Sequence, residues 1–288
     1  MARGRENIVS TKSVELPFGY EKFGTVEYQA EISKFKGRAQ RDVARLAKKS
    51  SPDATEILEA ALRPSLVGVG GEKTSGALLG SLSLADRDAL MFDVVRFTRG
   101  DIVPITQRCP RPGCDGVTTY DEFDLSTLPV TKLPRDAGVW WNGERTASQS
   151  EVDSLPPDEQ KKFRVRVFSV EDEKLGVKAL FRFPKGNDHR KIGKMAEREV
   201  EAIWTLMSCT CIRWSSPGVD HEAGKGNLPV SFWADLDLDV VELAQAEYTE
   251  AMPGIDSRVE FECSSCGNEF RAPVRALDFL FQGSDKRK

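Results

Sequence analysis

The chain has 288 residues, of which 40% are hydrophobic and 30% charged, a composition typical of a globular protein and unlike that of disordered or membrane proteins. Its 41 Lys and Arg residues nearly balance its 45 Asp and Glu residues, so the net charge of −4 gives no general attraction for nucleic acid. Residues 1–14 lack the apolar run of a secretory signal, and no later stretch approaches the roughly 18 apolar residues of a membrane span. Six cysteines are too few for a disulfide-dense secreted scaffold. We therefore expect a folded protein without membrane insertion, in a reducing cytoplasm where thiols stay available to metal ions.

The first part of the chain predicts one strand followed by helices. Apolar and polar residues alternate through 25–32, as in a strand with one buried face. Apolar residues at helical spacing then predict three helices, at residues 39–47, 54–62 and 86–98. Asp86 is expected to cap the third helix and Gly100 to end it. The glycine-rich stretch 64–81 is expected to be a connecting loop.

Two β-hairpins with cysteines at their tips are predicted, one in each half of the chain. They cover residues 103–120 and 259–274, where apolar residues alternate on both sides of a turn. The cysteines at the two tips are Cys109, Cys114, Cys263 and Cys266.

The region between the hairpins predicts a linker, a strand and further helices. Residues 129–157 are rich in proline, glycine and serine, which is typical of a linker or a long surface loop. Residues 163–167 alternate as a strand. Helices are expected at about 188–207 and 235–252. We call each cysteine-bearing hairpin tip a knuckle. The predicted organisation is an N-terminal half with the first knuckle (residues 1–134), a linker or long loop (135–160), and a C-terminal half with a helical insertion and the second knuckle (161–288).

The two halves share one order of elements: helix, glycine, strand, cysteine turn and strand. Gly100 precedes Cys109 by nine positions, and Gly254 precedes Cys263 by nine. Self-similarity of this kind indicates a duplicated unit. We therefore predict an α+β fold of two pseudo-repeated halves with helical insertions. Each half has strand, helices and β-hairpin, and the two knuckle hairpins join in one zinc ribbon.

The spacing of the four hairpin cysteines points to a structural zinc ion. Zinc prefers a tetrahedron of soft ligands, and a short Cys-x-x-Cys turn such as Cys263–Cys266 supplies two of them. Gly267 follows directly and allows the positive φ with which such turns close. Cys109 and Cys114 are a looser pair, with four residues between them. Neither pair alone completes a shell, so both are expected to converge on one Zn²⁺. Unrelated thiols, a redox dithiol and a disulfide remain the alternatives.

Other candidate chemistry in the sequence is sparse. Cys209 and Cys211 are spaced poorly for two metal ligands, so a buried or incidental role is expected. His189 and His221 have polar, loop-like surroundings that favour a surface role over catalysis. The Trp140-Trp141 pair is expected either to anchor a partner protein or to belong to a strand packed on the core, with the partner favoured.

The order of these motifs resembles the family of T-even-type phage baseplate hub assembly proteins, which also occurs in gene clusters of phage-derived contractile injection systems. The resemblance spans most of the chain, and the first cysteine turn departs from it, with four residues where the family usually has two. The segment Cys209–Asn227 is a second departure, because it is additional to the pattern of that family. The matching segments are Leu16-Pro17, Glu31–Leu46, Asp86–Leu90 with Arg96 and Gly100, the two cysteine turns, Asp124-Leu125, Leu133-Pro134, Phe163–Glu173, Pro253–Asp256 and Leu277–Phe281.

The resemblance implies a non-enzymatic structural or assembly protein of a contractile tail baseplate. Its partners would be other baseplate, hub and tail-tube proteins, with no role for nucleic acid. It would act in the cytoplasm of the bacterial host or producer during assembly, or in the tail baseplate of the mature particle. A transient chaperone and a permanent baseplate subunit both remain open.

Two rival interpretations come from the cysteines themselves. A zinc-ribbon nucleic-acid-binding protein needs basic and aromatic residues around the knuckles, whereas Glu260, Glu262 and Glu269 flank the second pair. A thiol oxidoreductase favours a helix amino terminus at its reactive cysteine, whereas strands are predicted on both sides of Cys263–Cys266. We therefore expect binding without catalysis.

Overall fold

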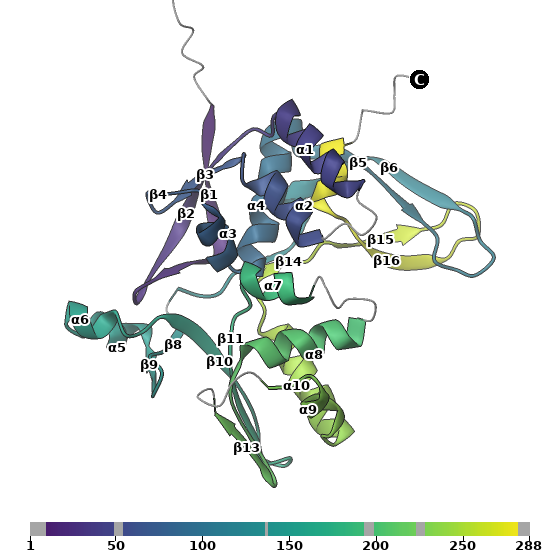
Figure 1. Cartoon of the computed structure of the whole chain (residues 1–288). Helices are drawn as coiled ribbons and strands as arrows, with labels where there is room; N and C mark the ends of the chain where they lie inside the picture. The colour runs from purple at the N-terminus through teal and green to yellow at the C-terminus, as the bar shows by residue number, and fades with distance from the viewer. Residues whose placement is uncertain (1–9, 49–53, 136–137, 193–198, 223–227, 282–288) are drawn as a thin grey trace, which may run out of the picture.

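The computed structural model describes residues 10–48, 54–135, 138–192, 199–222 and 228–281 of the chain. The fold is mixed α+β, with a four-stranded sheet, a six-stranded sheet and three two-stranded pairs. In Figure 1 the four-stranded sheet and its helices lie above the six-stranded sheet, and two hairpins project to the right. Within the described residues we find no helix with the length and apolar character needed to cross a membrane.

N-terminal residues build the four-stranded antiparallel sheet, in the order β1-β2-β3-β4. Its strands are β1 (Thr11–Lys22), β2 (Thr25–Ser33), β3 (Leu66–Val69) and β4 (Glu72–Lys73). β2 was predicted, but β1 was not, because Pro17 and Gly19 interrupt its pattern. The pairing of β1 with β2 shifts register between Glu15 and Tyr20. This irregularity, on an edge strand, is where a sheet tolerates proline and glycine.

The glycine-rich stretch 64–81 is not a plain loop, so that prediction is wrong. It contains β3, β4 and a short helix, α3 (Gly76–Ser81). Gly70 and Gly71 form the turn between β3 and β4, with φ angles of 53° and 79°. A two-residue hairpin turn with both φ angles positive favours glycine. Gly70 and Gly71 therefore form a turn between two strands and do not indicate a loop without strands.

Helices pack against one another and against β1 and β2. They are α1 (Gly37–Ala47), α2 (Ala54–Leu62), α4 (Leu84–Arg99) and the C-terminal α11 (Ala276–Phe281). α4 lies on β1 and β2, α2 and α11 pack on α4, and α1 packs on α2. The three helices predicted at 39–47, 54–62 and 86–98 are confirmed.

Asp86 does not cap α4, so that prediction is wrong. The N-cap is Ser83, whose Oγ accepts a hydrogen bond from the Asp86 amide at 3.0 Å. Asp86 is fully buried, and its Oδ1 accepts hydrogen bonds from the amides of Phe18 and Gly19 at 2.9 and 3.1 Å. Burial raises the pKa of Asp86 to about 6, against the opposing effect of these hydrogen bonds. The carboxyl group therefore joins β1 to α4.

The middle of the chain builds the six-stranded antiparallel sheet, in the order β13-β12-β11-β10-β8-β9. Its strands are β8 (Val139–Trp141), β9 (Thr146–Ser148), β10 (Val165–Asp172), β11 (Val177–Arg182), β12 (Cys211–Ser216) and β13 (Val219–Glu222). The associated helices are α7 (Gly186–Ile192), α8 (Glu199–Thr210), α9 (Ser231–Ala234) and α10 (Leu238–Glu250). These helices confirm the predictions near 188–207 and 235–252, apart from residues 193–198, which lie outside the described residues.

The segment expected as a linker or long surface loop is folded into this sheet, so that prediction is wrong. It contains β8 and β9, followed by α5 (Gln149–Asp153) and α6 (Pro157–Gln160). Ser148 and Glu151 form a capping box, and Pro157 begins α6, so these residues start short helices. Trp140 is buried and donates its Nε1–H to Gln149 Oε1 at 2.8 Å. Trp140 therefore packs in the core and does not anchor a partner, so the favoured prediction is wrong for this residue, whereas Trp141 is half-buried.

The two main hydrophobic cores group the residues differently from the predicted N-terminal and C-terminal halves. The first core contains buried residues from Val14–Leu128 and from Phe261–Leu280. The second core lies under the six-stranded sheet and uses residues from Val170–Tyr248. The last hairpin and α11 therefore return to the N-terminal body, where β14 (Gly254–Ile255) also pairs with β7 (Val130–Thr131), just after the 3-10 turn η1 (Leu125–Thr127).

Candidate metal centre

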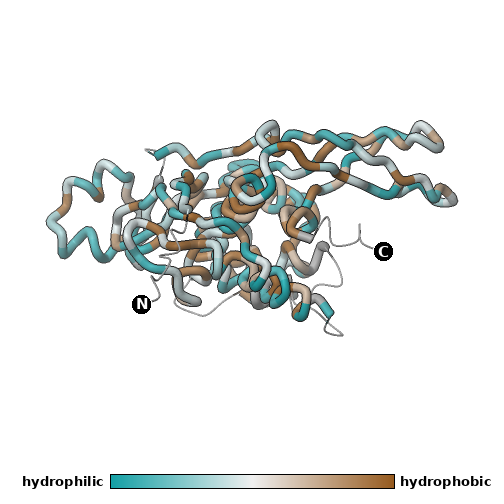
Figure 2. The backbone as a smooth tube through the Cα atoms, turned by 90° about the horizontal axis from the view of Figure 1, so that it is seen from above, coloured by the Kyte–Doolittle hydropathy of each residue, from teal (hydrophilic) through white to brown (hydrophobic). Residues whose placement is uncertain are grey.

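Two β-hairpins from distant parts of the chain form an arm that extends from the body (Figure 2). The arm, defined here as residues 102–124 and 258–273, confirms both hairpin predictions. Its strands are β5 (Ile102–Arg108), β6 (Val117–Asp124), β15 (Arg258–Glu262) and β16 (Glu269–Pro273). β5 pairs with β6 and β15 with β16, each antiparallel.

Side chains of β6 hold the two hairpins together. Thr118 Oγ1 donates to the carbonyl oxygen of Glu262 at 3.0 Å, and Tyr120 Oη donates to that of Glu260 at 3.4 Å. The Tyr120 ring also stacks on Phe261, with ring centroids 5.3 Å apart. The backbone of β15 is therefore bound along its length by β6, which fixes the relative position of the two turns.

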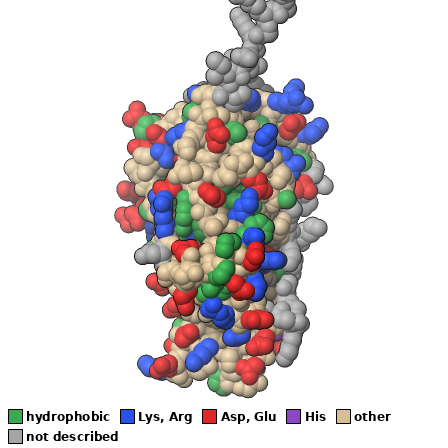
Figure 3. All heavy atoms as spheres, turned by 90° about the vertical axis from the view of Figure 1, so that its left-hand side faces the viewer, with side chains coloured by type: hydrophobic (Ala, Val, Ile, Leu, Met, Phe, Trp, Pro, Cys, Tyr) green, Lys and Arg blue, Asp and Glu red, His purple; other side chains and the backbone are tan. Residues whose placement is uncertain are grey.

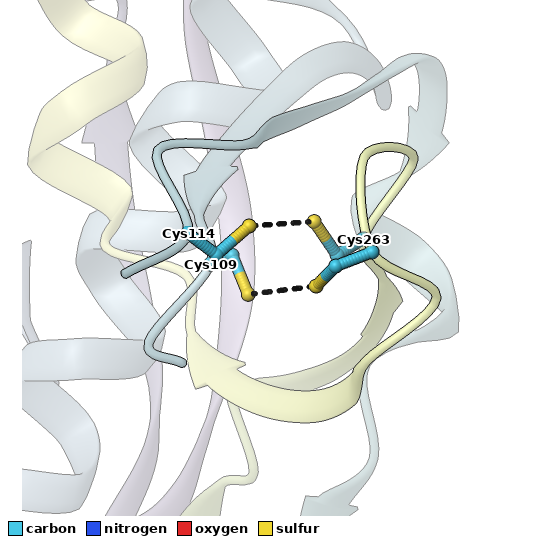
Figure 4. Close-up of side chains that lie close together, drawn as sticks. Cys109, Cys114 and Cys263 are labelled. Carbon is cyan, nitrogen blue, oxygen red and sulfur yellow. Dashed lines mark hydrogen bonds between the residues drawn. The ribbon is translucent and has the colours of Figure 1, made fainter. Parts of the chain in front are cut away.

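The four predicted cysteines meet at the end of the arm (Figure 4). Their Sγ atoms all lie within 4.8 Å of one another. The distance from Cys109 Sγ to Cys266 Sγ is 3.8 Å, and that from Cys114 Sγ to Cys263 Sγ is 3.7 Å. A metal ion with metal–sulfur bonds of about 2.3 Å places its tetrahedral sulfurs about 3.8 Å apart. A disulfide needs about 2.05 Å. The four cysteines therefore lie where they could bind one metal ion.

Backbone hydrogen bonds shape the first turn. The Cys109 amide donates to Gly116 O at 2.9 Å, and the Cys114 amide donates to Arg111 O at 3.0 Å. The Gly116 amide donates to Cys114 Sγ at 3.4 Å. Gly113 has a φ of 78°, which lets the longer turn close before Cys114. The four-residue spacing thus still directs both sulfurs to the same point.

The second turn is closed in a similar way. The Cys263 amide donates to Asn268 O at 2.9 Å, and the Gly267 amide donates to Cys263 O at 2.8 Å. Gly267 has a φ of 66°, as its place after Cys266 predicted. Asn268 Nδ2 lies 3.9 Å from Cys109 Sγ and can donate to it across the two turns. The side chain of Asn268 thus connects the second turn to a sulfur of the first.

Gly116 is a site residue that sequence reasoning missed. A Cβ atom at this position would lie 2.6 Å from Cys263 Sγ and 2.9 Å from Ser265 Oγ. Only glycine lets the first turn approach the second this closely. Its one signal in the sequence is its place two residues after Cys114, and its contact with Cys263 spans about half of the chain.

The thiols have different tendencies to ionise. Backbone amides of Ser265 and Cys266 lower the pKa of Cys263 to about 7. The Gly116 amide lowers the pKa of Cys114, but the neighbouring Cys266 thiol and burial outweigh it and raise the value to about 12. Thiolates are the form that binds metal, so a cation entering this site would release protons. Four filled sulfur positions leave none open for a water molecule, which is typical of structural sites.

The remaining cysteines are not part of this cluster. Cys209 lies in α8, and Cys211 is buried at the start of β12. Burial raises the pKa of Cys211 to about 12, so its thiol stays protonated. Arg182 donates a hydrogen bond to the carbonyl oxygen of Cys209 at 2.8 Å. These contacts fit the buried or incidental role that the spacing predicted.

Among the described residues, the four arm cysteines are the one group of His, Cys, Asp and Glu side chains arranged to hold a metal ion. A shell of four sulfurs in a tetrahedron is typical of zinc or iron. Comparisons with protein-family models, curated proteins and solved structures find no match for this chain.

Proposed function

We propose that this chain is a non-enzymatic structural or assembly protein that works by protein–protein binding on a zinc-stapled scaffold. The observation that carries the proposal is the meeting of cysteines from two hairpins, with Cys114 and Cys263 separated by 149 residues. A closed shell of four thiolates has no open coordination position for a substrate. The ion would therefore hold the arm together and would not take part in a reaction.

Within this proposal the two hairpins are the halves of a single split zinc ribbon. Each supplies one pair of thiolates, and the two pairs complete a tetrahedron that neither forms alone. The shared order of helix, glycine, strand and cysteine turn supports an origin by duplication. We propose zinc because it is the usual ion of a structural four-cysteine site.

The setting we propose is the baseplate of a contractile tail, in a phage or a phage-derived injection system. This part of the proposal is supported by the resemblance of the motif order to baseplate hub assembly proteins. The partners would be baseplate, hub and tail-tube proteins, met in the bacterial cytoplasm during assembly. Neighbouring genes for tail tube, sheath and tape-measure proteins would support this setting, and genes for an unrelated pathway would contradict it.

The alternative of a zinc-ribbon nucleic-acid-binding protein has weaker support. Three exposed carboxylates, Glu260, Glu262 and Glu269, lie on the second hairpin and would repel phosphate groups. A nucleic-acid-binding protein loses affinity steeply as salt concentration rises. Tight, salt-dependent DNA binding that requires the arm cysteines would overturn our proposal in favour of this alternative.

Elemental analysis of the purified protein tests the metal directly. We expect about one zinc per chain, which the Cys263→Ser variant should lose. Cys211→Ser is the matched control, because Cys211 is a buried cysteine outside the cluster. It should keep the zinc. Iron in place of zinc would correct the identity of the ion, and a metal-free protein with an ordered arm would refute the stapled scaffold.

Co-purification tests the assembly role. The chain should be expressed together with the products of its neighbouring genes and isolated through an affinity tag. We expect at least one of these products to co-purify with the wild-type chain and to be lost when the zinc is removed by a chelator. A chain that stays alone under these conditions, with its metal bound, would contradict binding as the function.

A further inference from the structure

The arm carries most of the net charge of the chain. Residues 102–124 and 258–273 contain seven acidic and four basic side chains, which leaves −3 of the total of −4. Four thiolates on one divalent ion would add about two further negative charges. Elsewhere the two signs are mixed: on the face that points away from the arm, red and blue side chains are interspersed (Figure 3). The arm is thus a negative projection from a nearly neutral body.

A groove of about 410 Å³ lies on this arm, where the two hairpins meet. Its walls include the carboxylates of Glu260, Glu262 and Glu269, the guanidinium group of Arg271 and the aromatic rings of Tyr120 and Phe270, so acidic groups outnumber basic ones three to one. All three carboxylates are exposed, and Tyr120 is 37% exposed. The groove therefore combines apolar surface with negative charge.

Two of the three acidic side chains of this groove, Glu262 and Glu269, have no basic partner among the described residues of the arm. Glu262 lies directly opposite Glu269 in the β15–β16 ladder, an arrangement of like charges that destabilises a hairpin. Arg271 lies opposite Glu260, but their charged atoms are 3.8 Å apart, and Arg271 also faces Asp256 at 3.9 Å. The ion pairs found among the described residues include none with Glu262 or Glu269. A hairpin that keeps this repulsion is well suited to a cationic partner.

We propose that this acidic groove docks a Lys- and Arg-rich segment of a partner protein. The inference rests on the proposed function, because it names the surface and the kind of partner through which the scaffold would bind. The stem of a lysine or arginine packs on aromatic surface such as Tyr120 and Phe270, while its charged end reaches Glu262 and Glu269. Complementary charge of this kind speeds association and excludes phosphate-bearing partners.

A fluorescein-labelled decapeptide of alternating Lys, Arg and Gly is a suitable probe, with binding followed by fluorescence anisotropy. The test variant is E260Q/E262Q/E269Q, in which the repulsion is relieved and the hairpin should stay folded. The matched control is E242Q/E247Q/E250Q, which removes three exposed carboxylates from α10. We expect the groove variant to bind at least 10-fold more weakly than wild type and the α10 variant to bind within twofold of it.

Equal losses in the two variants would reduce the effect to general electrostatics and overturn the proposal, as would an unchanged affinity in the groove variant. Tighter binding of a single-stranded DNA decamer than of the peptide would overturn it in favour of nucleic acid. Zinc content is measured on the same samples. If all variants keep zinc and none binds the peptide through the groove, the docking site fails while the stapled scaffold stands. If wild type lacks zinc, the proposed function fails, and the groove variant still decides the docking site.

Discussion

Replacing Gly116 by alanine should weaken metal binding through a single steric contact. The added Cβ would lie 2.6 Å from Cys263 Sγ, whereas non-bonded heavy atoms prefer about 3.5–4.0 Å. The two turns would have to separate by about 1 Å, and structural metal sites tolerate deviations of about 0.2 Å. The φ of Gly116 is not in the left-handed region, so alanine adds no backbone strain there. The expected defect is therefore confined to the approach of the turns.

We expect the zinc affinity of Gly116→Ala to fall about 10- to 100-fold, the usual effect of disturbing residues that support a metal site. This corresponds to about 1.4–2.8 kcal/mol. Competition with a chromophoric chelator measures the affinity, and far-UV circular dichroism checks that the body stays folded. Gly37→Ala is the matched control, because a Cβ at Gly37 meets no atom within 4 Å. Wild-type affinity in Gly116→Ala would refute the reasoning that the two turns converge on one ion.

Further predictions concern the thiols and the buried charges. Cys263→Ser should abolish metal binding by elemental analysis and cause local misfolding of the arm, seen as new protease cleavage; an intact arm would contradict this. Burial raises the pKa of Asp86 from 3.8 to about 6, so the folded state keeps a proton that the unfolded state releases. The protonated Asp86 carboxyl group contributes its full stability below about pH 4, and this stability is lost as the pH rises through about 6. The free energy of urea unfolding of Asp86→Asn, taken relative to wild type, should therefore rise by about 2–3 kcal/mol between pH 4 and pH 7. A difference that stays constant with pH would contradict this. Glu21→Gln should cost about 3–5 kcal/mol in urea unfolding, because it leaves Arg166 as a buried cation without its carboxylate. Glu21 and Arg166 are 3.3 Å apart, with side chains 2% and 1% exposed, and a cost below about 1 kcal/mol would contradict the pairing.

The cysteine cluster could be predicted from sequence because each half of it is local. Cys263 and Cys266 are close in the chain, Gly267 supplies the φ that closes their turn, and the need for four ligands joins them to Cys109 and Cys114. The strands and helices with strong periodicity, such as β2 and α1, were predicted for the same reason. Local spacing was enough to fix these elements.

What the sequence could not predict depends on contacts between distant residues. β1 contains Pro17 and Gly19, which are acceptable because the strand lies at an edge and shifts register there. β8 has three residues, and its place in a sheet depends on pairing with β10. Gly116 matters because of Cys263, which lies far along the chain. Each of these features becomes visible only when the partner element is in place.

The arm combines two weak hairpins that are fixed at both ends. A two-stranded hairpin alone is marginally stable in water, and neither hairpin of the arm belongs to a larger sheet. At the base, Val103 and Val274 are buried in the first core, while at the tip the four cysteines converge. In the chain-entropy model, a cross-link that closes a loop of 149 residues stabilises the fold by about 5 kcal/mol. Because most of the first core and all of the second are built from residues outside the arm, losing a metal ion should free the tip of the arm first and leave the body folded. The groove on the arm would lose its shape in the same step. Partner binding would therefore depend on the metal ion even though the partner does not touch the ion.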